Sequence, residues 1–433
     1  MSYRTFEAYK DSGIDWLGDI PRNWQHSRIK YVSKIETGDG DTQDAEVDAE
    51  YPFFVRSPII ERIGRYSHDT EAVLTAGDGA GVGKIFHRFR GKFSAHQRVY
   101  IVSKFVDVDP GYFYFYFSTI FGLVALDGSA KSTVESVRRP MIADLAITLP
   151  PLVEQKQIAD FLDRETAQID NLIAEQEGLV ENLTERRAAA IDQTVLGGLD
   201  VLRSPAAAVI PGDRTLRKGS HLAVEPELLK MPNNWKVVRF KAAMQRLDER
   251  NVGSKFTMMS LKISGEVVPR ASLNSRQEPS IEGIPRYLIA RQGDLVVNPM
   301  WLTGGSIGVS QVVGAVSPDY RVFRSRGFHE PRYLHHLMRS RPYIRQYKLY
   351  TRSDTTFDRR VQQGDLDNLP VAVPPLEEQR EIADYLDGRT FKTDALIEEA
   401  KALIDLLKER RSALISAAVT GKIDVRSEVL SRG

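Results

Sequence analysis

The sequence of 433 residues contains no cysteine, so disulfide bonds and cysteine-based metal or thiol chemistry are excluded. No run of eighteen apolar residues occurs, which excludes a membrane-spanning helix. The start, Met1-Ser2-Tyr3-Arg4, lacks the apolar core of a secretion signal. We therefore expect a cytoplasmic protein that makes no contact with a membrane.

The chain also lacks a strong overall charge, because 59 basic residues balance 58 acidic ones. Any binding to nucleic acid must then come from local basic surfaces. The 8 histidines are scattered, and neither an HExxH nor a GxSxG motif occurs. The sequence therefore predicts no metal site and no hydrolase site.

The chain does contain an internal repeat. The segment PPLVEQKQIADFLDRETAQID from Pro150 aligns without a gap with PPLEEQREIADYLDGRTFKTD from Pro374, and the match continues to ERRAAAIDQTVLGGLDV and ERRSALISAAVTGKIDV. A looser match pairs IPRNWQHSRIK at Ile20 with MPNNWKVVRFK at Met231. The repeat predicts the order domain, helix, domain, helix.

These matches, with a Pro- and Gly-rich stretch between the halves, predict an α+β protein with an internal pseudo-twofold repeat. The expected parts are an N-terminal arm (1–19), a first globular domain (20–150), a first long helix (151–197), a linker (198–230), a second globular domain (231–373), a second long helix (374–421) and a C-terminal tail (422–433).

Each long helix is expected to follow a proline pair and to end at a glycine, Gly197 or Gly421. Its length would be about 65 Å at 1.5 Å per residue. Apolar residues recur at heptad spacing, which favours pairing of the two helices over separate docking of each on its own domain. The expected pairing residues are Ile158, Leu162, Ile169, Leu172, Leu179, Leu183, Ile382, Leu386, Leu396, Leu403, Leu407 and Leu414.

The glycine-rich segment TAGDGAGVGKIF (75–86) resembles a nucleotide-binding loop. A Walker A motif would need glycine where Asp78 stands and a hydroxyl residue where Ile85 stands, so an NTPase site is not expected. Asn298-Pro299-Met300-Trp301 is similar to an adenine methyltransferase motif. A methyltransferase would need both elements in one continuous domain, whereas they lie in different halves. An intrinsic methyltransferase therefore remains a weaker alternative.

Two stretches without acidic residues, 79–106 and 332–353, interleave basic and aromatic residues. Such surfaces neutralise DNA phosphates and read guanine edges, although a solvated outer face gives the same pattern. With the flanking loops and the second glycine-rich segment, they supply the candidate DNA-binding residues Lys84, His87, Arg88, Arg90, Lys92, His96, Arg98, Lys131, Arg138, Arg139, Thr303, Arg339, Arg341, Arg345, Lys348, Arg352, Arg359 and Arg360.

Several segments together resemble the specificity subunit of type I restriction–modification systems. They are YKDSGIDWLGDIPRNW near the start, LPPLVEQKQIADFLD and VPPLEEQREIADYLD, the two helix ends that begin with ERR, and GDLVVNPMWLTGGSIGVS. The likeness covers nearly the whole chain. It differs inside the first domain, where GDGAGVGKIF stands in place of GGSIGVSQVV.

The resemblance implies a non-catalytic subunit with two target-recognition domains, each reading one half of a split, asymmetric site in double-stranded DNA. The two helices would pair antiparallel and set the gap between the half-sites. Two methyltransferase subunits, which use S-adenosylmethionine, and ATP- and Mg-dependent restriction subunits would bind to it, and the chain itself would hold no cofactor. A coiled-coil scaffold with only secondary DNA contacts is the alternative.

Overall fold

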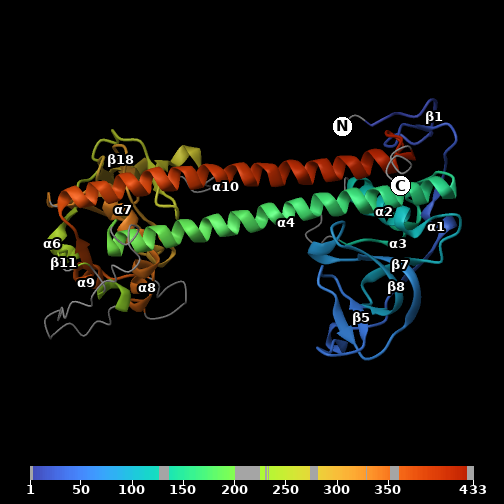
Figure 1. Cartoon of the computed structure of the whole chain (residues 1–433), viewed down its shortest axis with the longest axis horizontal. Helices are drawn as coiled ribbons and strands as arrows, with labels where there is room; N and C mark the ends of the chain where they lie inside the picture. Colours follow the sequence, from blue (N-terminus) through green and yellow to red (C-terminus); the bar gives the residue numbers. More distant parts are fainter. Residues whose placement is uncertain are drawn as a thin grey trace. The chain divides into compact units, whose positions relative to one another are not determined.

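The computed structural model describes residues 3–125, 136–199, 225–229, 232, 234–273, 281–327, 329–351 and 360–426. Most of the expected linker, 198–230, lies outside these residues, as does the end of the expected tail, 427–433. The chain forms two compact units (Figure 1). Unit 1 comprises residues 1–177 and 401–433, and unit 2 comprises residues 178–400.

Unit 1 is built on a six-stranded sheet in the order β4-β9-β7-β8-β5-β6, in which β5 and β8 pair in parallel and the other neighbours pair antiparallel. Its core contains Phe54, Leu74, Phe93 and Ile101. The strands are β4 (Lys34–Thr37), β5 (Tyr51–Phe54), β6 (Glu61–Ile63), β7 (His68–Ala76), β8 (Phe86–Ala95) and β9 (Val99–Ser103).

Two small antiparallel sheets and several short helices complete unit 1. The first sheet pairs β1 (Tyr9–Asp11) with β2 (Asp19–Pro21), and the second pairs β3 (Gln25–Arg28) with β10 (Ala146–Leu149). The helices are α1 (Ile29–Val32), η1 (Thr42–Asp44), η2 (Gly79–Gly81), α2 (Pro110–Ala125) and α3 (Arg139–Ala143).

Unit 2 repeats this plan with shorter strands. Its four-stranded sheet, β12-β19-β16-β17, matches the order β4-β9-β7-β8 of unit 1. The strands are β11 (Lys236–Arg239), β12 (Met244–Leu247), β13 (Met259–Leu261), β14 (Val267–Pro269), β15 (Leu288–Ala290), β16 (Leu295–Val297), β17 (Ile307–Val309), β18 (Gly314–Val316), β19 (Arg321–Ser325) and β20 (Pro370–Val373). The helices are η3 (Pro226–Leu229), α6 (Phe240–Ala243), η4 (Arg270–Ser272), η5 (Ile281–Arg286), η6 (Leu302–Gly304), α7 (Pro331–Arg339), α8 (Arg341–Leu349) and α9 (Gln363–Asn368).

Each unit contains a part of both long helices, α4 (Leu152–Gly197) and α10 (Leu376–Val419). Each helix starts directly after a proline pair, and a glycine with positive φ follows each end, Gly198 at +71° and Gly421 at +74°. Such a left-handed residue stops a helix, and glycine adopts it without a Cβ clash. In α10 the glycine at the helix end is the expected Gly421. In α4 it is Gly198, one residue after the expected Gly197.

Ion pairs connect α4 and α10 in each unit. In unit 1, Arg411 Nε lies 2.9 Å from Asp170 Oδ1, and Lys408 Nζ lies 3.7 Å from Glu177 Oε1. In unit 2, Arg187 Nε lies 2.8 Å from Asp394 Oδ1. Partners on α10 move backwards as α4 runs forwards, so the helices pair antiparallel (Figure 1).

The buried row of this helix pair differs in part from the expected one. Ile158, Leu162, Ile169, Ile382, Leu386, Leu407 and Leu414 are buried, and Leu183 is half-buried. Leu172, Leu179, Leu396 and Leu403 are 40–51% exposed, and their neighbours Ile173, Ile397 and Ile404 are buried instead. An α-helix drifts by about 20° per heptad from a strict 3.5-residue repeat, which moves the buried row to the adjacent residue.

Each globular part holds the start of one long helix through the Glu-Gln pair of its PPLxEQ segment. In unit 1, Trp24 Nε1 donates to Glu154 Oε1 at 2.9 Å, and Gln155 Oε1 accepts from the Asp109 backbone N–H at 2.8 Å. Unit 2 repeats both bonds, from Trp235 to Glu378 at 3.1 Å and from Glu330 to Gln379 at 2.9 Å. The Glu-Gln pair of this motif therefore binds the start of each long helix to a globular part.

Each globular part also holds the end of the other long helix through a buried tyrosine. In unit 1, the Tyr112 hydroxyl donates to Val419 O at 3.1 Å, and Thr148 Oγ1 donates to the same carbonyl at 2.9 Å. In unit 2, the Tyr333 hydroxyl donates to Val195 O at 3.3 Å. Since these carbonyls belong to the last turn of a helix, the tyrosines satisfy acceptors that the helix itself leaves open.

Candidate nucleic-acid interface

The glycine-rich segment of unit 1 forms the turn between two antiparallel strands. The ladder of β7 and β8 ends at the pair Thr75–Phe86, and η2 closes the turn with Gly79 at φ +77°. A Cβ on Gly81 would lie 2.9 Å from Arg56 O, so the chain's own backbone occupies that space. The glycines therefore serve a tight turn and not a phosphate-binding loop, and Lys84 is exposed on it.

Unit 2 has the corresponding turn between β16 and β17, where the ladder ends at Val297–Ile307 and η6 follows the strand. Gly305 supplies the left-handed residue at φ +87°. Thr303 is half-buried on this turn and Trp301 is 46% exposed. The two glycine-rich segments thus occupy the same place in the repeat.

Arginines gather beside the turn of unit 1. Asp78 accepts hydrogen bonds from Arg56 Nη1 at 2.7 Å and from Arg98 Nη1. The Val137 backbone N–H donates to Gly77 O at 2.7 Å, which brings the exposed Arg138 and Arg139 next to the turn. We call this set, Arg56, Asp78, Arg98, Arg138 and Arg139, the Asp78 cluster. Four guanidinium groups and one carboxylate give it a net positive charge.

The charge of Asp78 is maintained by its partners. Burial raises the pKa of Asp78, but the hydrogen bonds from Arg98 and Arg56 and their positive charges outweigh burial, so the pKa lies below its ordinary value. Asp78 therefore stays ionised at neutral pH and fixes the position of two arginines.

Arginines also gather beside the turn of unit 2. Arg321 stands at the start of β19, as Arg98 does just before β9, and its Nη1 donates to Val361 O at 3.2 Å. The Val361 backbone N–H donates to Pro299 O at 3.1 Å, which repeats the bond from Val137 to Gly77. Burial, and then the charges of Arg246 and Arg360, lower the pKa of Arg321. We call Arg246, Asp319, Arg321 and Arg360 the Arg321 cluster; Asp319 lies 4.0 Å from Arg360.

The basic face of β8 is largely neutralised by its neighbours. Arg88, Arg90 and Lys92 are exposed on alternate positions, as in a strand with one outer face. Glu71 lies opposite Arg90 and Asp69 lies opposite Lys92 on β7. Arg88 also contacts Glu71 and Asp163, each at 3.4 Å. A segment that contains no acidic residues can therefore lie next to acidic residues from other segments.

The two histidines of the same stretch point inwards. His96 is buried, and His87 is half-buried with Nε2 3.3 Å from Ser57 O. Burial lowers the pKa of both rings, which are therefore neutral at pH 7. These two DNA-binding candidates therefore lie with their rings turned toward the protein interior.

In the basic stretch of unit 2, the arginines bind groups of the protein itself. Arg339 Nη1 donates to the backbone oxygens of Ile263 at 2.8 Å, Ile307 at 3.3 Å and Gly305, and burial lowers its pKa to about 10. A separate set of ion pairs joins Arg341 to Glu185 at 2.6 Å and to Asp192, and Arg345 to Glu225 at 2.8 Å and Glu227 at 2.6 Å. The interleaved Tyr343 and Tyr347 are fully buried core residues.

Of the other candidates, Lys348 is exposed on α8, and Lys131, Arg352 and Arg359 lie outside the described residues. The clusters contain three arginines that the basic stretches did not indicate, Arg56, Arg246 and Arg321. The only sequence signal for Arg321 was its alignment with Arg98, since both precede a valine in the repeat.

Within the described ranges, no group of three or more histidine, aspartate or glutamate side chains is arranged to hold a metal ion. In the same part of the chain, no helix is both long enough and apolar enough to cross a membrane.

Residues 21–181 match the family model described as the type I restriction modification DNA specificity domain. The chain is 29% identical over 226 residues to the type I restriction enzyme EcoDI specificity subunit of Escherichia coli. That match spans 52% of this chain and 49% of the relative, so about half of the relative's length is covered. The chain is thus similar to type I restriction enzyme specificity subunits, and its residues 21–181 match the DNA specificity domain of these systems.

A second relative matches over nearly the full length. The chain is 23% identical over 438 residues to the type I restriction enzyme MjaVIII specificity subunit of Methanocaldococcus jannaschii, and the match covers 94% of this chain and 95% of that one. Its fold matches a chain of a solved structure described as showing complex assembly and conformational transition of the type I R-M system. The TM-score is 0.58 at 17% identity, with 92% and 98% of the two chains covered. The relatives are named as specificity subunits and not as catalytic subunits, and the prediction of a non-catalytic DNA-recognition component agrees with those names.

Proposed function

We propose that this chain is a specificity subunit that reads a bipartite, asymmetric site in double-stranded DNA, with one half-site bound by the globular part of each unit. The observation that carries the proposal is the pair of arginine clusters. The Asp78 cluster and the Arg321 cluster lie beside the same turn of the repeat, and each has more exposed guanidinium groups than carboxylates even when the buried Arg321 is left out. Arginine both neutralises phosphates and forms bidentate hydrogen bonds with guanine.

We propose further that α4 and α10 carry the methyltransferase subunits. In unit 1, Leu172 and Leu403 are exposed on the two helices, and in unit 2 Leu179 and Leu396 are exposed. The repeat pairs Leu172 with Leu396 and Leu179 with Leu403, so each unit offers one residue of each pair. Exposed apolar residues at equivalent positions suit two copies of one partner. Restriction subunits would join through this complex.

In this proposal the chain holds no cofactor of its own. S-adenosylmethionine would bind to the methyltransferase subunits, and ATP with Mg²⁺ would bind to the restriction subunits. The complex would act in the cytoplasm, where its DNA substrate lies.

The DNA contact is tested with Arg98→Ala and Arg138→Ala in the chain assembled with its methyltransferase subunits. We expect weaker binding of a DNA that carries the recognised sequence. The slope of log K against log salt should fall by about 1 for each phosphate that the variant no longer neutralises. Fluorescence anisotropy at several salt concentrations measures both quantities.

The matched controls are Arg341→Ala and Arg345→Ala. Each of these arginines is paired with two of the protein's own carboxylates, whereas Arg98 shares the single carboxylate of Asp78 with Arg56. We expect these two variants to keep the wild-type salt slope. An unchanged slope in the Arg98 and Arg138 variants, together with a reduced slope in the controls, would contradict the assignment of the interface to the Asp78 cluster.

A further inference from the structure

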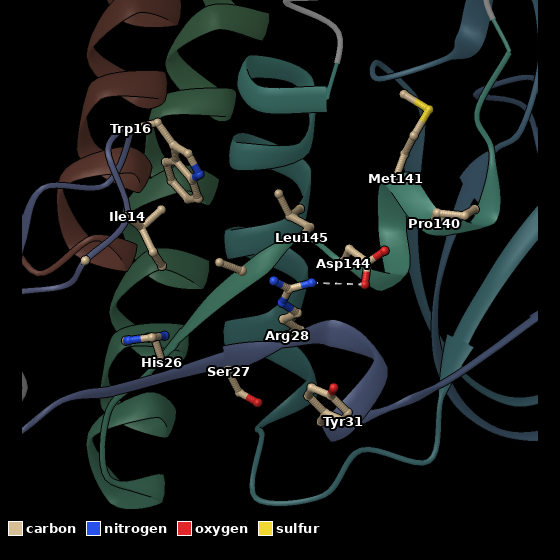
Figure 2. A pocket seen from close by; sticks show the side chains of 12 residues that line it. Ile14, Trp16, His26, Ser27, Arg28, Tyr31, Pro140, Met141, Asp144 and Leu145 are labelled. Atoms are coloured by element: carbon tan, nitrogen blue, oxygen red, sulfur yellow. Dashed lines mark hydrogen bonds and ion pairs between the residues drawn. The ribbon is translucent and has the colours of Figure 1, made fainter.

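Unit 1 carries a groove of about 800 Å³ (Figure 2). One wall is the turn of the N-terminal arm, with Ile14 and Trp16, and the other walls come from β3, α1 and α3. Trp16 is 39% exposed and Tyr31 is 69% exposed, and Met141 and Leu145 add further apolar surface. Aromatic residues, methionine and arginine are the residues enriched where proteins bind proteins.

The groove follows β3. His26, Ser27 and Arg28 are consecutive residues of this strand, and all three line the groove. Successive side chains of a strand point to opposite faces, so a cavity that meets three in a row reaches along the strand's edge. Among the described residues β3 pairs only with β10, which leaves its other edge without a strand partner. An unpaired edge is the surface to which an extended polypeptide adds as a new strand.

One carboxylate of the groove lining, Asp144, is shared by Arg28 of the lining and by Lys30 beside it. Arg28 Nη1 lies 3.3 Å from Asp144 Oδ1, and Lys30 Nζ lies 2.7 Å from the same oxygen. The Arg28 side chain is 56% exposed. Two cations sharing one carboxylate favour an occupant that brings a carboxylate of its own.

Unit 2 does not reproduce the lining of the groove, although it repeats the strand. The repeat places Ala242 where unit 1 has Tyr31, and Asp365 where unit 1 has Met141. Asn368 takes the place of Asp144. Because the aromatic and thioether groups are present in one copy of the repeat, the groove suits a contact made once in each specificity subunit.

We propose that the groove binds an extended, apolar segment of one methyltransferase subunit, which adds a strand to β3 and places a carboxylate near Arg28. The proposal rests on the proposed function, because it takes the occupant from the subunit that the chain is proposed to carry. Trp16, Tyr31 and Met141 cover the apolar side chains of the segment, and β3 supplies its backbone partners.

The test uses the full chain produced together with its methyltransferase subunit, and native mass spectrometry gives the number of bound copies. We expect two copies on the wild-type chain. With Tyr31→Glu we expect one copy to bind at least about tenfold more weakly, since a buried anchor at an interface contributes that much. Hydrogen exchange should show protection of the amides of residues 25–28 in the wild-type complex and loss of this protection in the variant.

Val47→Glu is the matched control, because Val47 is 94% exposed in the same unit and does not line the groove. It should keep both copies. If Tyr31→Glu also keeps both copies at wild-type affinity, or if residues 25–28 exchange equally with and without the partner, the groove is not the docking site. If the wild-type chain binds no methyltransferase subunit, both the groove assignment and the proposed scaffold function fail.

Discussion

Arg98 and Arg321 occupy the same position of the repeat but have different surroundings, so under the proposed function the two halves would contact DNA differently. The Arg98 side chain is 61% exposed and is held by Asp78. Arg321 is buried, and its guanidinium donates to a backbone oxygen. A fixed, exposed guanidinium suits direct contact with a base, whereas a buried one positions the backbone next to it. The change between the halves fits a target made of two unlike half-sites.

The Asp78 cluster makes a prediction about pH. Because the pKa of Asp78 is lower in the folded protein than the ordinary value of 3.8, its contribution to stability is present above that value and is lost as pH falls through the folded pKa. Urea unfolding followed from pH 7 down to pH 3 should therefore show a loss of stability below about pH 4 that is smaller in Asp78→Asn. An identical pH profile in the variant would mean that the arginine pairs do not stabilise unit 1.

At the level of secondary structure, the sequence indicated the long helices well because their signals are local. Leu152–Gly197 and Leu376–Val419 lie within two residues of the expected 151–197 and 374–421. Proline pairs, terminal glycines and a long apolar repeat act within a few residues of the chain. The prediction that Leu172 is buried was wrong, and Ile173 is buried in its place. Which of two adjacent residues faces the other helix depends on the exact number of residues per turn.

The candidate site was harder to predict because it depends on which strands become neighbours. The acids that face β8 come from β7 and α4, and Arg56 reaches Asp78 from the loop after β5. None of these pairs is close in sequence. A basic stretch therefore says how much charge a segment carries, but the neighbouring strands decide whether that charge is available to DNA.

The buried tyrosines that hold the helix ends give a prediction for α10. Tyr112→Phe removes the hydrogen bond to Val419 O and leaves Thr148 as its donor from the globular part. Since a typical hydrogen bond contributes about 0.5–1.5 kcal/mol, the last turn of α10 should open more often without unfolding unit 1. Hydrogen exchange measured by mass spectrometry should become faster in peptides that cover residues 416–423.

The matched variant is Tyr333→Phe, which removes the corresponding bond to Val195 O in unit 2. It should speed exchange in the last turn of α4 and leave residues 416–423 at the wild-type rate. Faster exchange at both helix ends in either variant would show that the two ends are not held independently.

For the whole molecule, the helix pair is proposed to set the spacing of the two half-sites. Four residues inserted after Gln176, with four more at the equivalent point after Ala400, lengthen each helix by about 6 Å. Since base pairs are stacked at about 3.4 Å, the permitted spacer should grow by about one or two base pairs. Methylome sequencing of cells that carry the altered system measures the spacer directly. A spacer of unchanged length would show that α4 and α10 do not act as the ruler.

The division of the chain into units has a consequence for its synthesis on the ribosome. Unit 2 is continuous, from residue 178 to residue 400, whereas unit 1 needs both the first 177 residues and the segment 401–433. Tyr112 and Thr148 cannot form their hydrogen bonds until Val419 has been synthesised, and Arg4 cannot pair with Asp424 before that residue is synthesised. Thr148 and Val419 are 271 residues apart, so at roughly 5–20 residues per second this interval is on the order of 14–54 s. The N-terminal half is therefore synthesised first, but its fold is completed last. Until then, the surface that binds the end of α10 is exposed and accessible to chaperones.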